Sequence, residues 1–144
     1  MRFRIWNPDE KRMYYSKDSS MMIDLSGDVY ETEYNGATYD LIYSPKSSIL
    51  RCLGYKDRYG AWLYEADVIR IDDAAIEFFR YGLVVWFDAG FAVKNIRTGE
   101  MWRIENGCMM HRTIEHAISI PFTDTTIIGN KFENYNLIEK AMSK

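Results

Sequence analysis

The chain has 144 residues, of which 18 are Lys or Arg and 21 are Asp or Glu, so its formal net charge is −3. Hydrophobic residues make up 47% of the chain and aromatic residues 15%, which excludes an intrinsically disordered protein and supports one ordinary hydrophobic core. The mild acidity gives no general reason to coat DNA, although a local basic patch stays compatible with it.

Membrane and secretion signals do not stand out. The longest uninterrupted apolar run, Leu83–Phe87, is far shorter than the roughly 20 residues that cross a bilayer. Residues 1–8 carry charges and a proline, unlike a signal peptide. Cys52 and Cys108 lie in unrelated contexts, so we expect two buried thiols, with a disulfide as the alternative. We therefore expect a cytoplasmic protein.

The N-terminal third predicts two β-hairpins. Phe3–Trp6 alternates apolar and charged residues, and Met13–Tyr15 has the composition of its return strand. Residues 16–28 predict a loop with one short strand. Val29–Tyr43 predicts a second hairpin, which turns at the dipeptide Asn35-Gly36 because both residues accept positive φ.

The segment Ser44–Ser48 is the most linker-like stretch of the chain. We expect a single domain, with an N-terminal hairpin region over residues 1–45 and a β-barrel core with a C-terminal helix over residues 46–144.

The middle of the chain predicts further short strands, at Ile49–Leu53, Trp62–Tyr64 and Val68–Ile71. Asp72–Arg80 begins with acids and is followed by Gly82, which predicts either one or two helical turns or an extension of the preceding strand.

Two more hairpins are predicted beyond residue 82. Leu83–Phe87 and Phe91–Val93 flank Asp88-Ala89-Gly90, a three-residue loop with glycine where positive φ is wanted. A turn at residues 97–100 leads into a strand at Met101–Ile104, whose facing the pattern leaves open.

The C-terminal segment predicts a last strand, Thr125–Asn130, and a short helix. Asn136 and Glu139 have the spacing of a capping box, in which each side chain accepts a backbone N–H of the other end. An apolar stripe follows, formed by Leu137, Ile138, Ala141 and Met142. A helix this short must pack on the sheet to be stable. The sum is a mainly β, α+β protein.

Three segments in order resemble the YopX family of phage and prophage proteins over nearly the whole chain. They are Phe3–Asn7 with Met13–Tyr15, Leu53–Gly60 followed by Leu63–Ile69, and Ile127–Asn134. The resemblance implies an antiparallel, small β-barrel of SH3-like character and a phage accessory role. It implies no enzymatic activity, and hence no catalytic residues and no cofactor.

Two positions depart from the family pattern. Ala66 stands where glycine is usual, which suggests that the turn after Glu65 need not adopt positive φ here. Tyr135 stands where proline is usual, which predicts a looser start of the last helix.

The matching residues have a structural explanation. Turn and corner residues bend and close a small barrel, because carboxylates accept backbone N–H groups at turns and glycine relieves strained positions. We expect Tyr64, Glu65 and Asp67 to hold a corner between strands, and Asn130 and Glu133 to anchor the last strand to the helix. The predicted structural signature is Gly54, Asp57, Gly60, Tyr64, Glu65, Asp67, Gly129, Asn130, Glu133 and Asn134.

Catalytic and metal-binding patterns are weak. Cys108, His111, Glu115 and His116 are close in sequence and all have ligand chemistry, but their spacing fits no zinc motif. We expect a polar surface segment beside a buried cysteine, with a metal-dependent hydrolase as the least favoured function. We therefore expect no catalytic residue, no cofactor and no metal.

A basic and aromatic surface is the main alternative to a purely structural interpretation. Small barrels bind single-stranded nucleic acid through aromatic faces with nearby cations. The first hairpin and one turn supply such residues: Arg2, Arg4, Trp6, Lys11, Arg12, Tyr14, Tyr15, Lys56, Arg58 and Tyr59.

We predict a non-enzymatic binding module that associates with itself and with a phage or host protein. The Met21–Ile23 and Met109–Met110 segments are candidates for that contact, because methionine adapts to irregular surfaces. The alternative is a nucleic-acid-binding protein.

Overall fold

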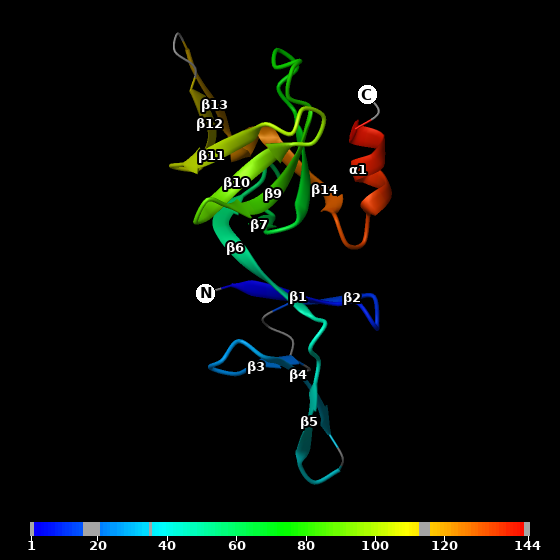
Figure 1. Cartoon of the computed structure of the whole chain (residues 1–144). Coiled ribbons are helices and arrows are strands. Elements are labelled where there is room, and N and C mark those ends of the chain that lie inside the picture. The colour runs from blue at the N-terminus through cyan, green and yellow to red at the C-terminus, as the bar shows by residue number, and fades with distance from the viewer. Residues whose placement is uncertain (1, 16–20, 35, 113–115, 143–144) are drawn as a thin grey trace. The chain divides into compact units, whose positions relative to one another are not determined.

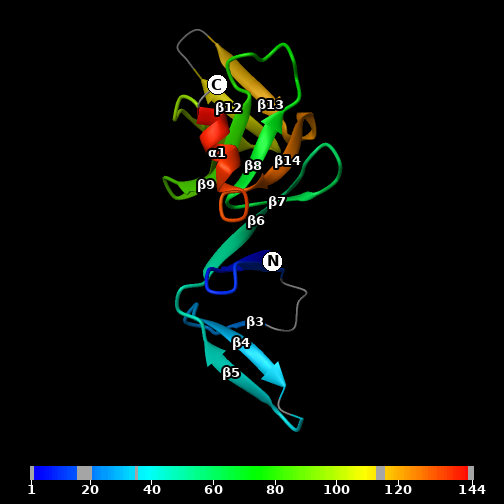
Figure 2. The same cartoon turned by 90° about the vertical axis from the view of Figure 1, so that its right-hand side faces the viewer.

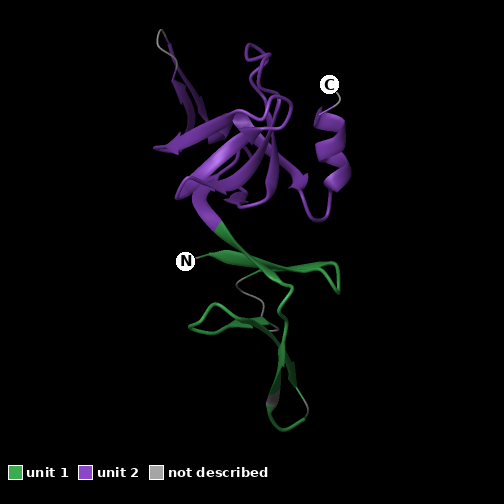
Figure 3. Cartoon of the chain, viewed as in Figure 1, with its two compact units in different colours: residues 1–51 green, residues 52–144 purple. Residues whose placement is uncertain are grey.

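The computed structural model describes residues 2–15, 21–34, 36–112 and 116–142. The chain forms two compact units, residues 1–51 and residues 52–144, which Figure 3 colours separately. They divide between Arg51 and Cys52, inside strand β6 (Ser48–Lys56), and not within the linker-like Ser44–Ser48. The single domain expected from the length stays a prediction.

Unit 1 begins with the predicted hairpin. Strands β1 (Phe3–Asn7) and β2 (Arg12–Tyr15) pair antiparallel, and the first half of β6 pairs with the other edge of β1. Asn7 closes the turn between them, because its Oδ1 accepts the N–H groups of Asp9 and Glu10 at 3.0 and 3.3 Å. This prediction is confirmed.

A three-stranded antiparallel sheet completes unit 1, with β4 (Val29–Tyr34) between β3 (Met21–Ile23) and β5 (Tyr39–Tyr43). The short strand and the second hairpin are therefore confirmed, while Asn35 of its turn lies outside the described residues. The core of the unit is small. It consists of Ile5, Tyr14 and Val29, with Phe3, Met21, Ile23 and Ile49 packed around them.

Unit 2 is built on a seven-stranded antiparallel sheet that curls into a half-barrel (Figures 1 and 2). Its order is β13-β12-β11-β10-β9-β8-β14, and within the described residues no ladder joins β13 to β14. The fold is mainly β, as predicted; a closed, SH3-like barrel stays a prediction. The strands of this sheet are β8 (Asp67–Ile71), β9 (Tyr81–Phe87), β10 (Gly90–Asn95), β11 (Met101–Glu105), β12 (Cys108–Arg112), β13 (Ala117–Pro121) and β14 (Thr125–Asn130). Strand β7 (Trp62–Tyr64) pairs instead with β6.

The inner face of this sheet carries the main core. Trp102 of β11 is fully buried and meets Phe79 edge-on, with ring centroids 4.9 Å apart. Trp102 therefore lies on the core side of β11, which the sequence pattern had left open. Gly82 of β9 lets the Val93 side chain pack closely against the β9 backbone, because a Cβ at Gly82 would lie 2.5 Å from Cγ1 of Val93. The other members are Leu63, Ile69, Ile71, Val84, Met109, Ile120 and Phe122.

The C-terminal helix α1 (Tyr135–Met142) packs on unit 2 as predicted, but two details were wrong. Ile138 and Ala141 contact a cluster that contains Val68 and Ile96, whereas Met142 is exposed. The helix begins at Tyr135, so Asn136 already lies inside the first turn and is not its cap. The helix therefore starts one position before the predicted capping box.

Two loops also differ from their predictions. Residues 72–80 form neither a helix nor a strand, because Asp73 closes a local turn: its backbone O accepts the N–H of Ile76 at 3.1 Å. The β9–β10 loop has two residues, Asp88 and Ala89, both with positive φ, as a tight hairpin turn requires. Gly90 belongs to β10 and pairs with Phe87.

Strands β12 and β13 were not predicted as strands. They pair antiparallel from Cys108↔Pro121 to Arg112↔Ala117 (Figure 1). The predicted polar surface segment is therefore half of a hairpin, and its cysteine is only half-buried. Met109 is fully buried in the core, so it is not available for self-association.

Candidate functional site

The residues of the predicted structural signature lie at turns and corners of unit 2. Asp57 is buried, and its carboxylate binds two segments: Oδ1 accepts the N–H groups of Tyr59 and Ala61, each at 2.9 Å, and Oδ2 accepts the N–H of Ile127 at 3.0 Å. Gly54 and Gly60 both have positive φ, at the irregular part of the β6–β7 ladder and in the turn. Asp57 therefore joins the turn after β6 to β14.

The corner between β7 and β8 is closed by Asp67, which is buried and accepts the N–H of Tyr64 at 2.8 Å. Ala66 between them has φ of 73°, so the expectation that this turn avoids positive φ was wrong. Its N–H donates to Val84 O at 2.8 Å, and its O accepts the N–H of Lys131 at 2.9 Å. These two bonds keep the alanine in the left-handed region. Glu65 is half-buried.

Asn130 organises the connection from β14 to α1. Its Oδ1 accepts the N–H groups of Phe132 and Glu133, and its Nδ2 donates to Oε1 of Glu133 at 2.9 Å. Its own N–H donates to Oδ1 of Asn134 at 3.1 Å. Gly129 leaves room for that contact, because a Cβ there would lie 2.5 Å from the same Oδ1.

The four residues with metal-ligand chemistry do not form a group in the described part of the chain. Glu115 lies outside the described residues, and His116 is exposed immediately before β13. His111 stacks on Trp102 with ring centroids 5.1 Å apart, and its Nε2 lies 3.4 Å from Oε2 of Glu100. Within residues 2–15, 21–34, 36–112 and 116–142, no cluster of His, Cys, Asp and Glu is suited to hold a metal ion.

The predicted basic and aromatic surface on the first hairpin was partly wrong. Arg4, Trp6 and Tyr14 are buried, with 4%, 8% and 5% of their surface exposed. Tyr14 belongs to the core of unit 1 and donates its hydroxyl to Oε2 of Glu10. Burial, followed by that bond, raises the pKa of Tyr14. Three of the proposed contact residues are therefore unavailable to a ligand.

The rest of that surface is exposed. Arg2, Arg12 and Tyr15 are exposed in unit 1. In unit 2, the turn after β6 carries a cluster of cations over rings: Lys56 lies 4.6 Å from the ring centre of Trp62, and Arg58 lies 5.8 Å from that of Tyr59. Tyr59 is largely exposed. Sequence reasoning therefore identified this turn correctly as exposed, aromatic and basic.

Strand β5 is the most apolar exposed element of unit 1. It forms one edge of the three-stranded sheet, and 52% of Leu41, 45% of Ile42 and 54% of Tyr43 are exposed. Successive side chains of a strand point to opposite faces, so β5 exposes apolar groups on both.

Of the predicted methionine segment, only Met22 is exposed, because Met21 and Ile23 pack in the core.

The sequence shows that β5 is apolar on both faces, but not that it forms the edge of a sheet. Residues 39–43 place three large apolar residues in succession, where a half-buried strand alternates apolar and polar residues. Unit 1 has too small a core to cover both faces of such a strand.

Among the described residues, no helix is long and apolar enough to span a membrane.

Comparisons with known proteins cover nearly the whole chain. The family model described as YopX protein matches residues 2–139. Among solved structures, protein yopX from Bacillus subtilis is similar with a TM-score of 0.60 and 15% identity, over 96% of this chain and 95% of that chain. Protein EF1440 from Enterococcus faecalis is similar with a TM-score of 0.55 and 18% identity, over 95% of this chain and 96% of that chain. At these identities both likenesses concern the fold alone. No curated protein matches this sequence.

Proposed function

This chain belongs to the YopX family, and we propose that it is a phage or prophage accessory protein that acts as a non-enzymatic binding module and assembles with a second copy of itself. The observation that carries the proposal is the exposed apolar edge strand β5 in unit 1. In this proposal the module works in the cytoplasm of the host cell, and the half-barrel of unit 2, with its SH3-like character, is a scaffold.

The backbone of β5 suits pairing with a further strand. Ser44 and Val29 form a hydrogen-bonded pair, because the Ser44 N–H donates to Val29 O at 2.8 Å. In an antiparallel ladder such pairs alternate with pairs that share no hydrogen bond. The bonds to β4 therefore fall on Ile42 and Asp40, and Leu41 and Tyr43 direct their N–H and C=O groups away from β4. Such an outward row is a template for another strand.

A second copy of the same strand fits this row. In an antiparallel ladder with its two-fold axis at Leu41, the outward-facing positions 39, 41 and 43 of one copy meet positions 43, 41 and 39 of the other. Asp40 then lies opposite Ile42 of the other copy, so no two carboxylates face each other. This is an isologous contact, the type that closes into a dimer.

The apolar area supports the same occupant. Leu41, Ile42, Tyr43 and Tyr34 are each about half exposed, which corresponds to on the order of half of the roughly 800 Å² that each partner contributes to a standard interface. Natural proteins cover such edges or protect them with charge. Asp40 is the only charged residue of β5.

The experiment is a measurement of mass in solution by light scattering over a range of protein concentration. We expect a dimer for the parent chain and a monomer for the double variant Leu41→Thr/Ile42→Thr, because threonine keeps strand propensity and removes the apolar contact. Phe87→Thr, at a half-exposed residue of β9 in unit 2, is the matched control and should leave the dimer intact. A parent chain that stays monomeric at every concentration would contradict the proposal.

Nucleic-acid binding is a second candidate, supported by the cations over Trp62 and Tyr59. Aromatic rings beside cations bind single-stranded bases by stacking and by charge attraction. The probe is a fluorescent single-stranded oligonucleotide. Under this candidate, affinity falls steeply with salt and is lost in Tyr59→Ala, whereas the control Arg112→Gln in β12 binds normally. Absence of binding at low salt would exclude it.

A further inference from the structure

The three-stranded sheet of unit 1 has one face turned away from the core of the unit. Val29 of β4 and its partner Ile23 of β3 lie on the core side, and successive side chains of a strand alternate between the two faces. Residues directly opposite each other on antiparallel strands share a face. By this register the outer face carries Met22 of β3, Tyr30, Thr32 and Tyr34 of β4, and Leu41 and Tyr43 of β5.

All charged residues of the three strands lie on the core side of the sheet. They are Glu31, Glu33 and Asp40. Glu31 and Glu33 alternate with the outer residues of β4, and Asp40 is paired with Glu33. The outer face is therefore uncharged. In β-sandwiches, sheet faces of this kind pack on a second sheet about 10 Å away.

The aromatic rings of the outer face are held in place. Tyr30 and Tyr43 contact each other, with ring centroids 5.4 Å apart. Tyr43 donates its hydroxyl to Asp28 Oδ1 at 3.4 Å, and Tyr34 donates its hydroxyl to Gly36 O at 3.0 Å. Because these contacts fix the rings before any partner arrives, docking on them loses little side-chain entropy.

The area of the outer face indicates what covers it. Met22, Tyr34, Leu41 and Tyr43 are 42%, 60%, 52% and 54% exposed, which corresponds to on the order of 400 Å² per copy. Pairing of two copies through β5, with the two-fold axis at Leu41, places both outer faces on one side of a continuous sheet. The combined face has on the order of 800 Å², the contribution of one partner to a standard interface. Soluble monomers expose only roughly 300–600 Å² in their largest apolar patch.

We propose that the outer face is a second self-association surface, at which two dimers paired through β5 pack face to face into a tetramer. This inference rests on the proposed dimer, because one copy alone offers only half of the required area. The two-fold axis of each dimer runs through its pair of Leu41 residues, perpendicular to the sheet, so two stacked dimers share that axis. The assembly is then closed, with D2 symmetry, and every outer face is covered.

The experiment is light scattering of the full chain over a range of protein concentration. We expect the dimer at low concentration and a tetramer as the concentration rises. A parent chain that stays dimeric up to its solubility limit would overturn this inference and leave the proposed dimer intact. A parent chain that stays monomeric at every concentration would overturn both.

The test variant is Met22→Thr/Tyr34→Thr, which removes apolar groups from the outer face and leaves β5 unchanged. We expect this variant to remain dimeric at every concentration, since threonine keeps strand propensity and removes the apolar contact. A tetramer of the variant would contradict the inference. A monomeric variant would contradict it as well, because the outer face would then hold the dimer itself.

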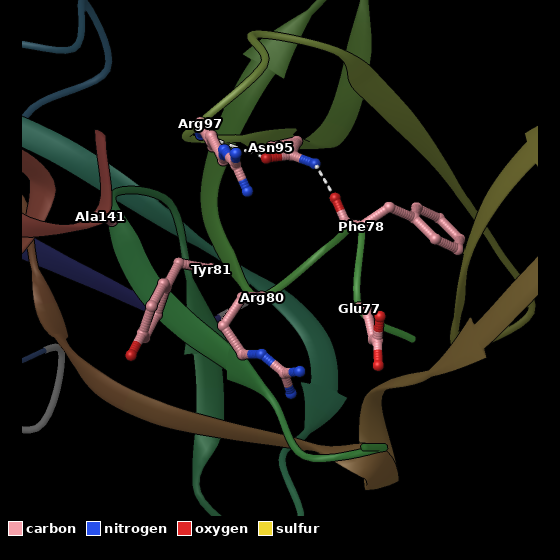
Figure 4. A pocket seen from close by; sticks show the side chains of 7 residues that line it. All are labelled: Glu77, Phe78, Arg80, Tyr81, Asn95, Arg97 and Ala141. Carbon is pink, nitrogen blue, oxygen red and sulfur yellow. Dashed lines mark hydrogen bonds between the residues drawn. The ribbon is translucent and has the colours of Figure 1, made fainter. Parts of the chain in front are cut away.

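Phe78→Thr is the matched control in unit 2, at an aromatic residue that is 53% exposed. Figure 4 shows the Phe78 ring directed away from Asn95, whose Nδ2 donates to Phe78 O at 3.0 Å and whose Oδ1 accepts the N–H of Arg97 at 3.1 Å. The substitution keeps these bonds, because they involve only the backbone of Phe78. We expect this control to form the tetramer at the same concentrations as the parent chain. Loss of the tetramer in the control would place the contact in unit 2 and refute the inference.

Discussion

The carboxylate of Asp57 accepts the backbone N–H of Ile127, 70 positions further along the chain, at 3.0 Å. The same side chain closes its own turn through two other N–H groups. One buried carboxylate thus ties the turn after β6 to the irregular part of β14.

Asp57→Asn is expected to destabilise the protein by about 1–3 kcal/mol, because an amide group cannot accept with both terminal atoms and one buried N–H loses its partner. Thermal unfolding measures the effect. Asp73→Asn is the control: Asp73 makes a similar turn contact in an exposed loop through Oδ1 alone, so the amide oxygen of asparagine can keep that bond. Equal losses in the two variants would show that the contact with Ile127 contributes nothing.

At Ala66 we expect an unusual order of stability. Its φ of 73° strains any residue with a Cβ, and a β-branched side chain most of all. Ala66→Val should therefore destabilise by more than about 2 kcal/mol, while Ala66→Gly stays within about 1 kcal/mol of the parent, since relief of strain offsets the lost methyl group and the added chain entropy. At the exposed strand residue Ala117, valine should be tolerated better than glycine. Denaturant unfolding compares the four variants.

Gly129→Ala is expected to cost about 1–3 kcal/mol, because the new methyl group would overlap Oδ1 of Asn134 and Cδ1 of Leu137. The overlap also displaces the acceptor of the Asn130 N–H, so the start of α1 should fray. Loss of helical circular dichroism together with a lower melting temperature would report both effects. Gly90→Ala serves as the control, since nothing lies within 4 Å of a Cβ at Gly90. A neutral Gly129→Ala variant would contradict the close approach.

A pair of carboxyl groups in unit 1 should make stability depend on pH. The hydrogen bond with Glu10, followed by burial, raises the pKa of Glu31; the bonds with Glu31 and then Tyr14 lower the pKa of Glu10. Protonated Glu31 therefore stabilises the fold fully below its ordinary pKa of 4.5, and that contribution disappears as the pH rises through its folded value. The contribution of ionised Glu10 is present above pH 4.5 and disappears as the pH falls through its own folded value.

Glu31→Gln is expected to stabilise the protein at neutral pH, with a gain that shrinks to nothing below pH 4.5. The glutamine keeps an acceptor for Asn7 Nδ2, which now donates to Glu31 Oε1 at 2.8 Å, and supplies Glu10 with a permanent N–H donor. Urea unfolding at a series of pH values measures this. Glu33→Gln, at an exposed residue of the same strand, should change little. A gain in Glu31→Gln that does not vary with pH would contradict the hydrogen bond between protonated Glu31 and ionised Glu10.

Most strands could be predicted from the sequence because their signals are local. The alternation of Phe3–Trp6 and the dipeptide at residues 35–36 act within a few positions, and both hairpins are confirmed. Strand β12 gives no clean signal because its two methionines are adjacent, with Met109 buried and Met110 half-buried. Ile118, Ser119 and Ile120 of β13 do alternate apolar and polar residues, so that strand could have been predicted from the sequence. The loop at residues 72–80 was mistaken because its acidic start is also typical of a helix cap.

By itself, the sequence determined the succession of hairpins, the turn residues that bend them and the family to which the chain belongs. These depend on side chains that lie next to each other along the chain. Only the tertiary structure decided that Arg4 and Trp6 are buried, that β5 is an exposed apolar edge, and that Asn95 joins Phe78 to Arg97. Burial and sites of this kind depend on segments distant in sequence, and local periodicity carries no information about which distant segment covers a given face.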